Sequence, residues 1–104
     1  EALKIAGPAY KVWHDSLTKR WRDNNVEGPS FARNTVDTVE KAIAGCAHIA
    51  GSPETVRQQL AEQIDALGVN YLVMAFNIGD MAHEDALRSI TLFGEEVMPK
   101  LADL

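Results

Sequence analysis

Apolar residues recur along the first part of the chain with the spacing of a helix. Four large apolar residues follow one another at steps of three or four, which places them on one face of a helix over residues 8–22. They are Tyr10, Trp13, Leu17 and Trp21. Pro8 suits an early position in that helix. Residues 1–22 are therefore expected to be helical, with the two tryptophans packed in a core.

A polar stretch, DNNVEGPSFARNT, occupies residues 23–35 and carries Gly28-Pro29 at its centre. This composition predicts a loop or an insertion. Its length exceeds that of most connections within a domain, so it could be a mobile lid or a tolerated insertion. Apolar spacing then predicts a short helix over residues 36–45.

Residues 52–68 carry the clearest helix signals in the chain. Ser52 can accept a hydrogen bond from a free amide of the first turn, and Pro53 suits the first helical position. Gly68 suits the residue that ends the helix. The expected apolar stripe consists of Val56, Leu60, Ile64 and Leu67.

Two apolar segments flank that helix, CAHIAG at residues 46–51 and VNYLVMAF at residues 69–76. An almost unbroken apolar run of this length is typical of a parallel strand that is covered on both faces. A last helix is predicted from about His83 to about Leu101, with Pro99 kinking or ending it. Its expected buried side consists of Leu87, Ile90, Val97 and Leu101.

The predicted order makes residues 36–104 an αβαβα portion and the fold class α/β with a parallel sheet. Two parallel strands do not form a stable sheet by themselves. Each large apolar side chain left in water forfeits roughly 1.5–3 kcal/mol. The chain is therefore expected to associate with the rest of its own polypeptide or with further copies of itself.

Composition narrows the possible partners and compartments. The net charge of -5 and the pI near 5.0 argue against a nucleic-acid partner or an anionic membrane surface, since both favour basic patches. Cys46 is the single cysteine, which excludes an intramolecular disulfide and favours a reducing, cytoplasmic compartment. No apolar run reaches the roughly 18 residues of a membrane span.

An ordered series of short patterns covers residues 48–101. It runs from Gly51-Ser52-Pro53-Glu54 through Gly79-Asp80 and HEDALRS to FGEEVMPKL at residues 93–101. This series resembles the carboxyl-terminal end of the luciferase-like, flavin-dependent monooxygenases. Each pattern is common by itself, whereas the ordered series is more specific.

The resemblance implies a (β/α)8 barrel whose seventh and eighth strands are residues 46–51 and 69–76. Residues 1–104 would then be one carboxyl-terminal fragment of the barrel domain, holding its last two βα units. The implied parent is an oxidoreductase that oxidises a small organic substrate with O2 and reduced FMN, and the fragment itself would be inactive. Some relatives use a deazaflavin. The alternative from a different class is a free-standing small α/β oligomerisation or interaction module without catalysis.

Barrel enzymes carry their active sites at the carboxyl ends of the strands. The resemblance thus implies that five residues lie at the rim of a flavin pocket: Gly51, Ser52, Asn77, Gly79 and Asp80. Ser52 and Asp80 can equally serve as helix caps. No catalytic residue is identified.

No metal site is predicted from the sequence. Cys46 and His48 would share one face of a strand, but a metal needs three or four convergent ligands. Another group of acidic and histidine side chains is better explained by its favourable interaction with a helix dipole. This group consists of Asp80, His83, Glu84 and Asp85.

Overall fold

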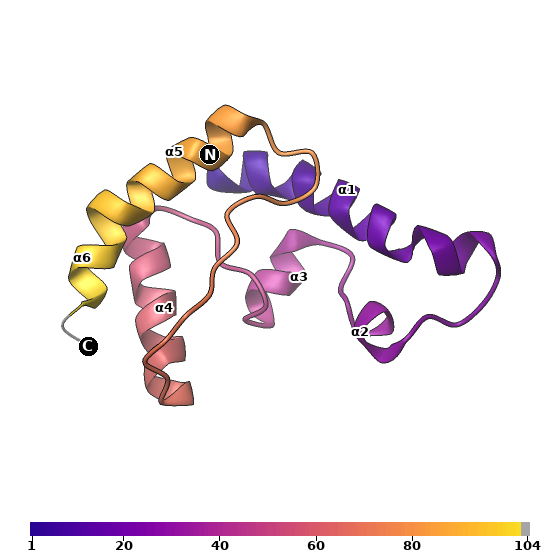
Figure 1. Ribbon diagram of the computed structural model, residues 1–104, viewed down its shortest axis with the longest axis horizontal. Coiled ribbons are helices and arrows are strands. Elements are labelled where there is room, and N and C mark those ends of the chain that lie inside the picture. The colour runs from indigo at the N-terminus through magenta and orange to yellow at the C-terminus, as the bar shows by residue number, and fades with distance from the viewer. Residues whose placement is uncertain (103–104) are drawn as a thin grey trace.

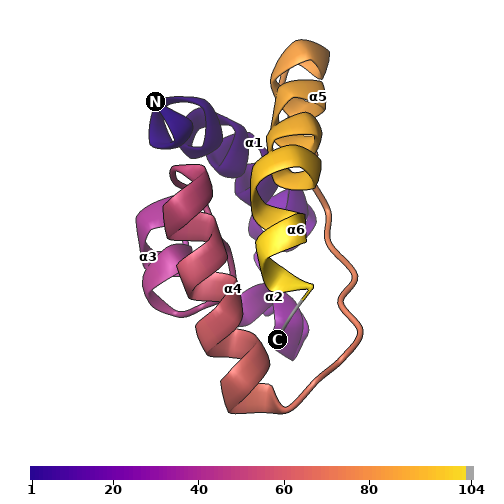
Figure 2. The same ribbon diagram turned by 90° about the vertical axis from the view of Figure 1, so that its left-hand side faces the viewer.

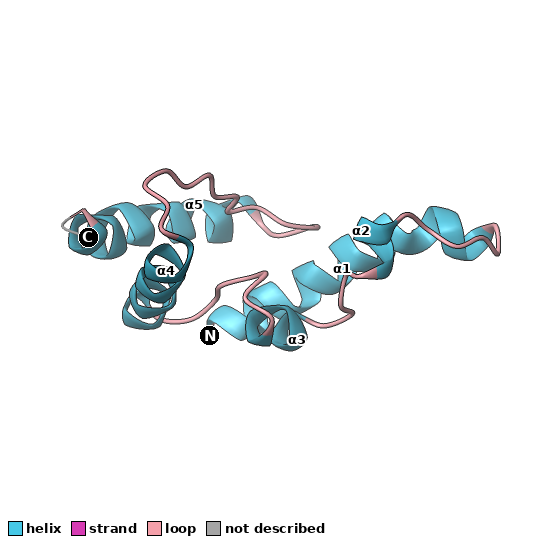
Figure 3. Ribbon diagram, turned by 90° about the horizontal axis from the view of Figure 1, so that it is seen from below, coloured by secondary structure: helices cyan, strands magenta, loops and turns pink. Residues whose placement is uncertain are grey.

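The computed structural model describes residues 1–102, and within this range the chain forms helices and irregular segments but no strand (Figure 1; Figure 3). Four helices have six or more residues: α1 (Ala2–Asp23), α3 (Val39–Ala44), α4 (Pro53–Leu67) and α5 (His83–Leu92). The short helices are α2 (Ser30–Arg33), the π-helical turn η1 (Phe93–Val97) and α6 (Met98–Leu101).

The helices form two groups. In one group α1 packs against α3, and in the other α4 packs against η1 and α6 (Figure 1; Figure 2). An ion pair between Glu1 Oε1 and Arg88 Nη1, 2.8 Å apart, joins the start of α1 to α5. The radius of gyration is 15.2 Å, against about 13 Å for a compact domain of 100 residues. The two groups therefore make a more open molecule than a typical domain of this length.

Helix α1 begins at Ala2, so Pro8 lies inside the helix and not at its first turn. Proline has no amide proton, so one hydrogen bond of the ladder is missing there. The first half of the predicted stripe faces α3, where Tyr10, Val39 and Ala42 form the buried core cluster and Trp13 packs against it partly buried. Neither α1 nor any other helix in residues 1–102 is sufficiently apolar over a sufficient length to cross a membrane.

Helix α4 confirms the prediction made from its two end signals. The Ser52 hydroxyl accepts a hydrogen bond from the Thr55 amide at 3.2 Å. Gly68 has a left-handed backbone with φ of 64°, and its amide donates to the Ile64 carbonyl at 2.9 Å. Leu60 on the predicted stripe is buried, but Leu67 at the end of the stripe is 69% exposed.

The last predicted helix is continuous from α5 to α6 but widens into a π turn at η1. Pro99 follows this turn and cannot donate to the carbonyl four residues earlier, and its ring would crowd that carbonyl. The Met98 amide donates instead to Phe93, five residues earlier, which is the π-helical pattern. The π turn thus accommodates Pro99 without ending the helix.

The buried side predicted for this last helix is only partly right. Val97 is buried, as predicted, and so is Ala86. Leu87 and Ile90 are 54% and 49% exposed, whereas Ala86 beside them is 7% exposed, so α5 is covered on another side. An apolar strip on α5 therefore faces solvent.

The strand predicted at residues 46–51 is wrong. Cys46 has a positive φ of 61°, which a strand does not allow. The amides of Ala47 and His48 both donate to the Ala42 carbonyl, at 2.9 and 3.2 Å, and so complete the end of α3. These amides serve the helix terminus and are not available for a sheet.

The strand predicted at residues 69–76 is also wrong, because the segment has no strand beside it among the described residues. The α/β fold class, and with it the last two βα units of a (β/α)8 barrel, is therefore contradicted. The sequence pattern shows that these segments are apolar. A sheet also requires a neighbouring strand to pair with, and residues 1–102 contain none. The αβαβα portion expected over residues 36–104 is helical where it is regular, up to residue 101.

Candidate functional site

Gly51 and Ser52 have local structural roles at the start of α4. The Ser52 hydroxyl lies 3.0 Å from the Thr55 hydroxyl, in addition to accepting from the Thr55 amide. A Cβ at Gly51 would come within 2.9 Å of Thr55 Cγ2, so the first turn of α4 leaves no room for a larger residue. The conformation of both residues is thus set by contacts with the first turn of α4.

Asn77, Gly79 and Asp80 lie in the turn that leads into α5. Asn77 and Asp80 are exposed, and the Met81 amide closes the turn by donating to the Ile78 carbonyl at 3.1 Å. Gly79 has a φ of 59°, and a Cβ built on it would fall 2.0 Å from the Ala9 carbonyl oxygen. Gly79 therefore lets this turn lie directly on the backbone of α1.

The two sets of predicted rim residues face different neighbours. Ser52 bonds within the first turn of α4, whereas Gly79 lies against α1. They were expected to meet because the carboxyl ends of parallel strands share one edge of a sheet, and residues 1–102 contain no sheet. Two open pockets of the described part of the chain, which we call cavities below, are lined by other residues.

The first of these cavities lies between α1 and α3 and has a volume of about 390 Å³. Its aromatic wall combines Tyr10, Trp13 and His48. The His48 ring meets Tyr10 edge-on with centroids 5.0 Å apart, and the Trp13 ring is 6.1 Å from His48. Its polar edge carries Asn34 and Lys41. A mostly apolar pocket with a few polar groups is a common form of small-molecule site.

His48 is a titratable group of this cavity whose pKa is shifted by burial. Its Nδ1 atom is buried and has no hydrogen-bond partner. Burial lowers the pKa of His48 from its ordinary value, because the charged imidazolium loses hydration, and a contact with the Ala47 backbone acts in the opposite direction. The side chain is therefore held as a neutral imidazole at neutral pH.

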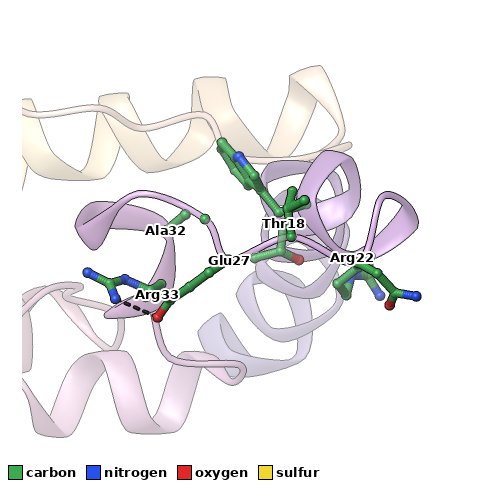
Figure 4. Close-up of a pocket in the computed structure, with 9 residues that line it drawn as sticks. Thr18, Arg22, Glu27, Ala32 and Arg33 are labelled. Carbon is green, nitrogen blue, oxygen red and sulfur yellow. Dashed lines mark hydrogen bonds and ion pairs between the residues drawn. The ribbon is translucent and has the colours of Figure 1, made fainter.

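The second cavity, about 400 Å³ in volume, lies between the end of α1 and residues 25–33 (Figure 4). Trp21 packs edge-on against Phe31 with centroids 6.0 Å apart. A Cβ at Gly28 would lie 3.1 Å from the Trp21 ring, so the loop returns closely onto the helix. An ion pair between Arg33 and Glu27, 2.6 Å long, closes one side. The predicted loop at residues 23–35 thus packs on α1 and includes the short helix α2.

The potential metal ligands do not gather into a site in the described part of the chain. Cys46 is exposed at the end of α3, and no group of three or more His, Cys, Asp or Glu side chains converges within residues 1–102. Glu84 and Asp85 lie in the first turn of α5, where they complement the helix dipole.

No direct signal along the chain predicted the cavity beside His48. Tyr10 and Trp13 were expected in a helical core stripe, which they join, but His48 was placed on a strand. Its contact with the two rings depends on the turn that ends α3, and a left-handed Cys46 is not predictable from local sequence preference.

A comparison with protein-family models, with curated protein sequences and with solved structures gave no match for this chain. The family resemblance therefore depends on the residues of the 48–101 series alone.

Proposed function

We propose that the chain is the carboxyl-terminal portion of a luciferase-like, FMN-dependent monooxygenase and is inactive by itself. The observation that carries this proposal is the ordered series of patterns at residues 48–101. Two of these patterns also mark element boundaries. Ser52-Pro53 opens α4, and HEDALRS at residues 83–89 opens α5. The proposal concerns the reaction class of the parent enzyme and does not include the barrel arrangement.

The predicted rim residues have local contacts of their own. The Ser52 hydroxyl is engaged by Thr55, and Gly79 is pressed against α1. In enzymes of this class the reduced flavin supplies the oxygen chemistry. No step of that chemistry is assigned to residues of this chain.

The test compares two proteins, the one encoded by the complete gene and the 104-residue chain. We expect the complete protein to bind FMN and to consume O2 when reduced FMN and a small organic substrate are supplied. The 104-residue chain should neither quench FMN fluorescence nor consume O2. A complete protein that folds and still binds no flavin would contradict the proposal, as would a gene that encodes these residues and nothing more. Deazaflavin binding in place of FMN would assign the parent to a different oxidoreductase of the same family.

The second candidate is a non-catalytic interaction or oligomerisation module. The observation that favours it is the extended, exposed and uncharged segment at residues 69–76. Such a segment is suited to pairing with another chain. A gene that encodes these residues and nothing more would favour this candidate over the monooxygenase.

The proposed compartment is the cytoplasm, and the proposed partners exclude nucleic acid and anionic membranes. A single exposed cysteine is compatible with a reducing compartment. The net charge of -5 disfavours both polyanionic partners. Fractionation of the source cells with an antibody against the chain would test the compartment.

A further inference from the structure

The segment Val69–Phe76 is an extended part of the chain whose side chains alternate in exposure from Tyr71 to Met74, whereas Val69 before them is 36% exposed. Tyr71 and Val73 are 80% and 86% exposed, whereas Leu72 and Met74 are both 39% exposed. A period of two residues is the period of a β-strand. One face of the segment is thus half covered and the other is open, although no strand lies beside it among residues 1–102.

One residue of the half-covered face contacts the π-helical turn η1. The Phe76 ring meets the Phe93 ring of η1 at a centroid distance of 5.3 Å. Elsewhere the segment runs from the end of α4 to the start of α5 along the outside of the molecule (Figure 1; Figure 2). Its outer side is therefore free to accept a neighbour.

The backbone of the segment is free to pair as well. Within the part of the chain that the structure describes, residues 69–77 neither donate nor accept a backbone–backbone hydrogen bond. An extended edge with free amides and carbonyls is a template for strand pairing. A run of this kind with aromatic and β-branched residues, no charge and no proline favours such pairing.

Charge and symmetry favour a second copy of the chain as the partner. Each copy carries a net charge of -5, so two copies repel over most of their surfaces. Residues 66–79 contain no charged side chain, which allows two copies to approach there without opposing like charges. A two-fold interface needs a surface that complements itself, and an antiparallel pair of identical strands provides one.

The alternation of exposure selects the register. Pairing centred on Val73 places Val73 opposite its own copy and Leu72 opposite Met74 of the second copy. In this register the exposed residues of both copies share one face, and the half-covered residues share the other. A register shifted by one residue would mix the two faces.

We propose that two copies of the chain associate by antiparallel pairing of residues 69–77, with the two-fold axis between the two Val73 residues. The pairing gives hydrogen-bond partners to the free backbone groups. It also removes from water part of Tyr71 and Val73 and of the same residues in the second copy. This association depends on the geometry of the segment and not on flavin, so its test and the FMN test can fail separately.

The first experiment measures molar mass by light scattering during size-exclusion chromatography over a range of protein concentrations. We expect a dimer at high concentration for the natural chain. Val73→Lys sets two ammonium groups against each other at the two-fold axis and should give a monomer. Val12→Lys is the matched control, because Val12 is also exposed (42%) but lies on α1, and it should stay dimeric. Far-UV circular dichroism checks that both variants remain helical.

The second experiment tests the register by oxidative cross-linking. In a Cys46→Ser background, Val73→Cys should form a disulfide between two copies, since opposed residues of antiparallel strands have Cα atoms about 4.5–5.5 Å apart, within disulfide range. Val12→Cys in the same background should not. A monomer at every concentration, open-ended aggregates in place of a dimer, or a dimer that survives Val73→Lys would overturn the proposal.

Discussion

The Gly79 Cα lies so close to the backbone of α1 that a Cβ at this position would be 2.0 Å from the Ala9 carbonyl oxygen. The contact fixes the end of the extended segment on the amino-terminal helix. Because Gly79 also has a φ of 59°, both space and backbone conformation require glycine here.

Gly79→Ala should destabilise the chain more than Gly68→Ala. Both glycines have a left-handed backbone, which costs alanine roughly 1–2 kcal/mol. A Cβ at Gly68 meets nothing within 4 Å, whereas at Gly79 it overlaps Ala9, and such overpacking adds about 1–3 kcal/mol. Urea denaturation of the two variants measures the difference. Equal losses in the free energy of unfolding would show that the turn does not lie on α1.

Tyr10→Phe should lower stability by about 1 kcal/mol, the usual worth of one hydrogen bond. The buried Tyr10 hydroxyl donates to the Val36 carbonyl at 2.6 Å, and the variant leaves that carbonyl without its donor. Tyr71→Phe is the matched control, because Tyr71 is 80% exposed. It should leave the midpoint of urea denaturation unchanged. If both variants behave alike, Tyr10 does not tether the segment before α3.

Ser52→Ala should cost about 1 kcal/mol, since it removes the side chain that caps α4. Ser16→Ala makes the same chemical change at an exposed position inside α1, where alanine favours the helix slightly. Thermal unfolding followed by circular dichroism should therefore show a lower Tm for the first variant alone. An unchanged Tm for Ser52→Ala would argue against the cap.

The stability of the chain should fall as pH drops below the ordinary pKa of histidine, 6.5. Burial lowers the pKa of His48 in the folded chain, so the unfolded chain binds the proton more readily in this range. The contribution of His48 is therefore present above pH 6.5 and is lost between that value and the lower folded pKa.

The measurement compares urea denaturation at several pH values for the natural chain, His48→Phe and His83→Gln. His48→Phe should flatten the pH dependence in this window. His83→Gln, which changes an exposed histidine at the start of α5, should keep it. A natural chain whose stability rises on acidification through this window would contradict the burial of His48.

Local signals in the sequence predicted what local chemistry controls. Ser52, Pro53 and Gly68 define the two ends of α4, and the structure follows them. Pro99 was expected to kink or end the last helix, whereas the structure has a π turn before it and the helix continues to Leu101. These effects depend on neighbours within a few residues along the chain, so the sequence contains the information directly.

Features that depend on distant partners were not predictable in the same way. An apolar run such as residues 69–76 indicates that burial of the segment is favourable, but it does not indicate which surface covers the segment. The exposure of Leu87 likewise depends on which side of α5 meets the other helices. The predicted pocket rim related Ser52 and Gly79 only through a sheet, so the pattern did not indicate that Ser52 bonds to Thr55 or that Gly79 lies on α1.

The most direct test of the unpaired segment is hydrogen–deuterium exchange of the amides at residues 69–77, measured at low and high protein concentration. We expect these amides to exchange freely in dilute solution and to gain protection as concentration rises, while the amides of α4 change little. The Val73→Lys variant should show no such gain. Exchange at residues 69–77 that stays fast at every concentration, in a chain whose helices remain protected, would contradict pairing between copies.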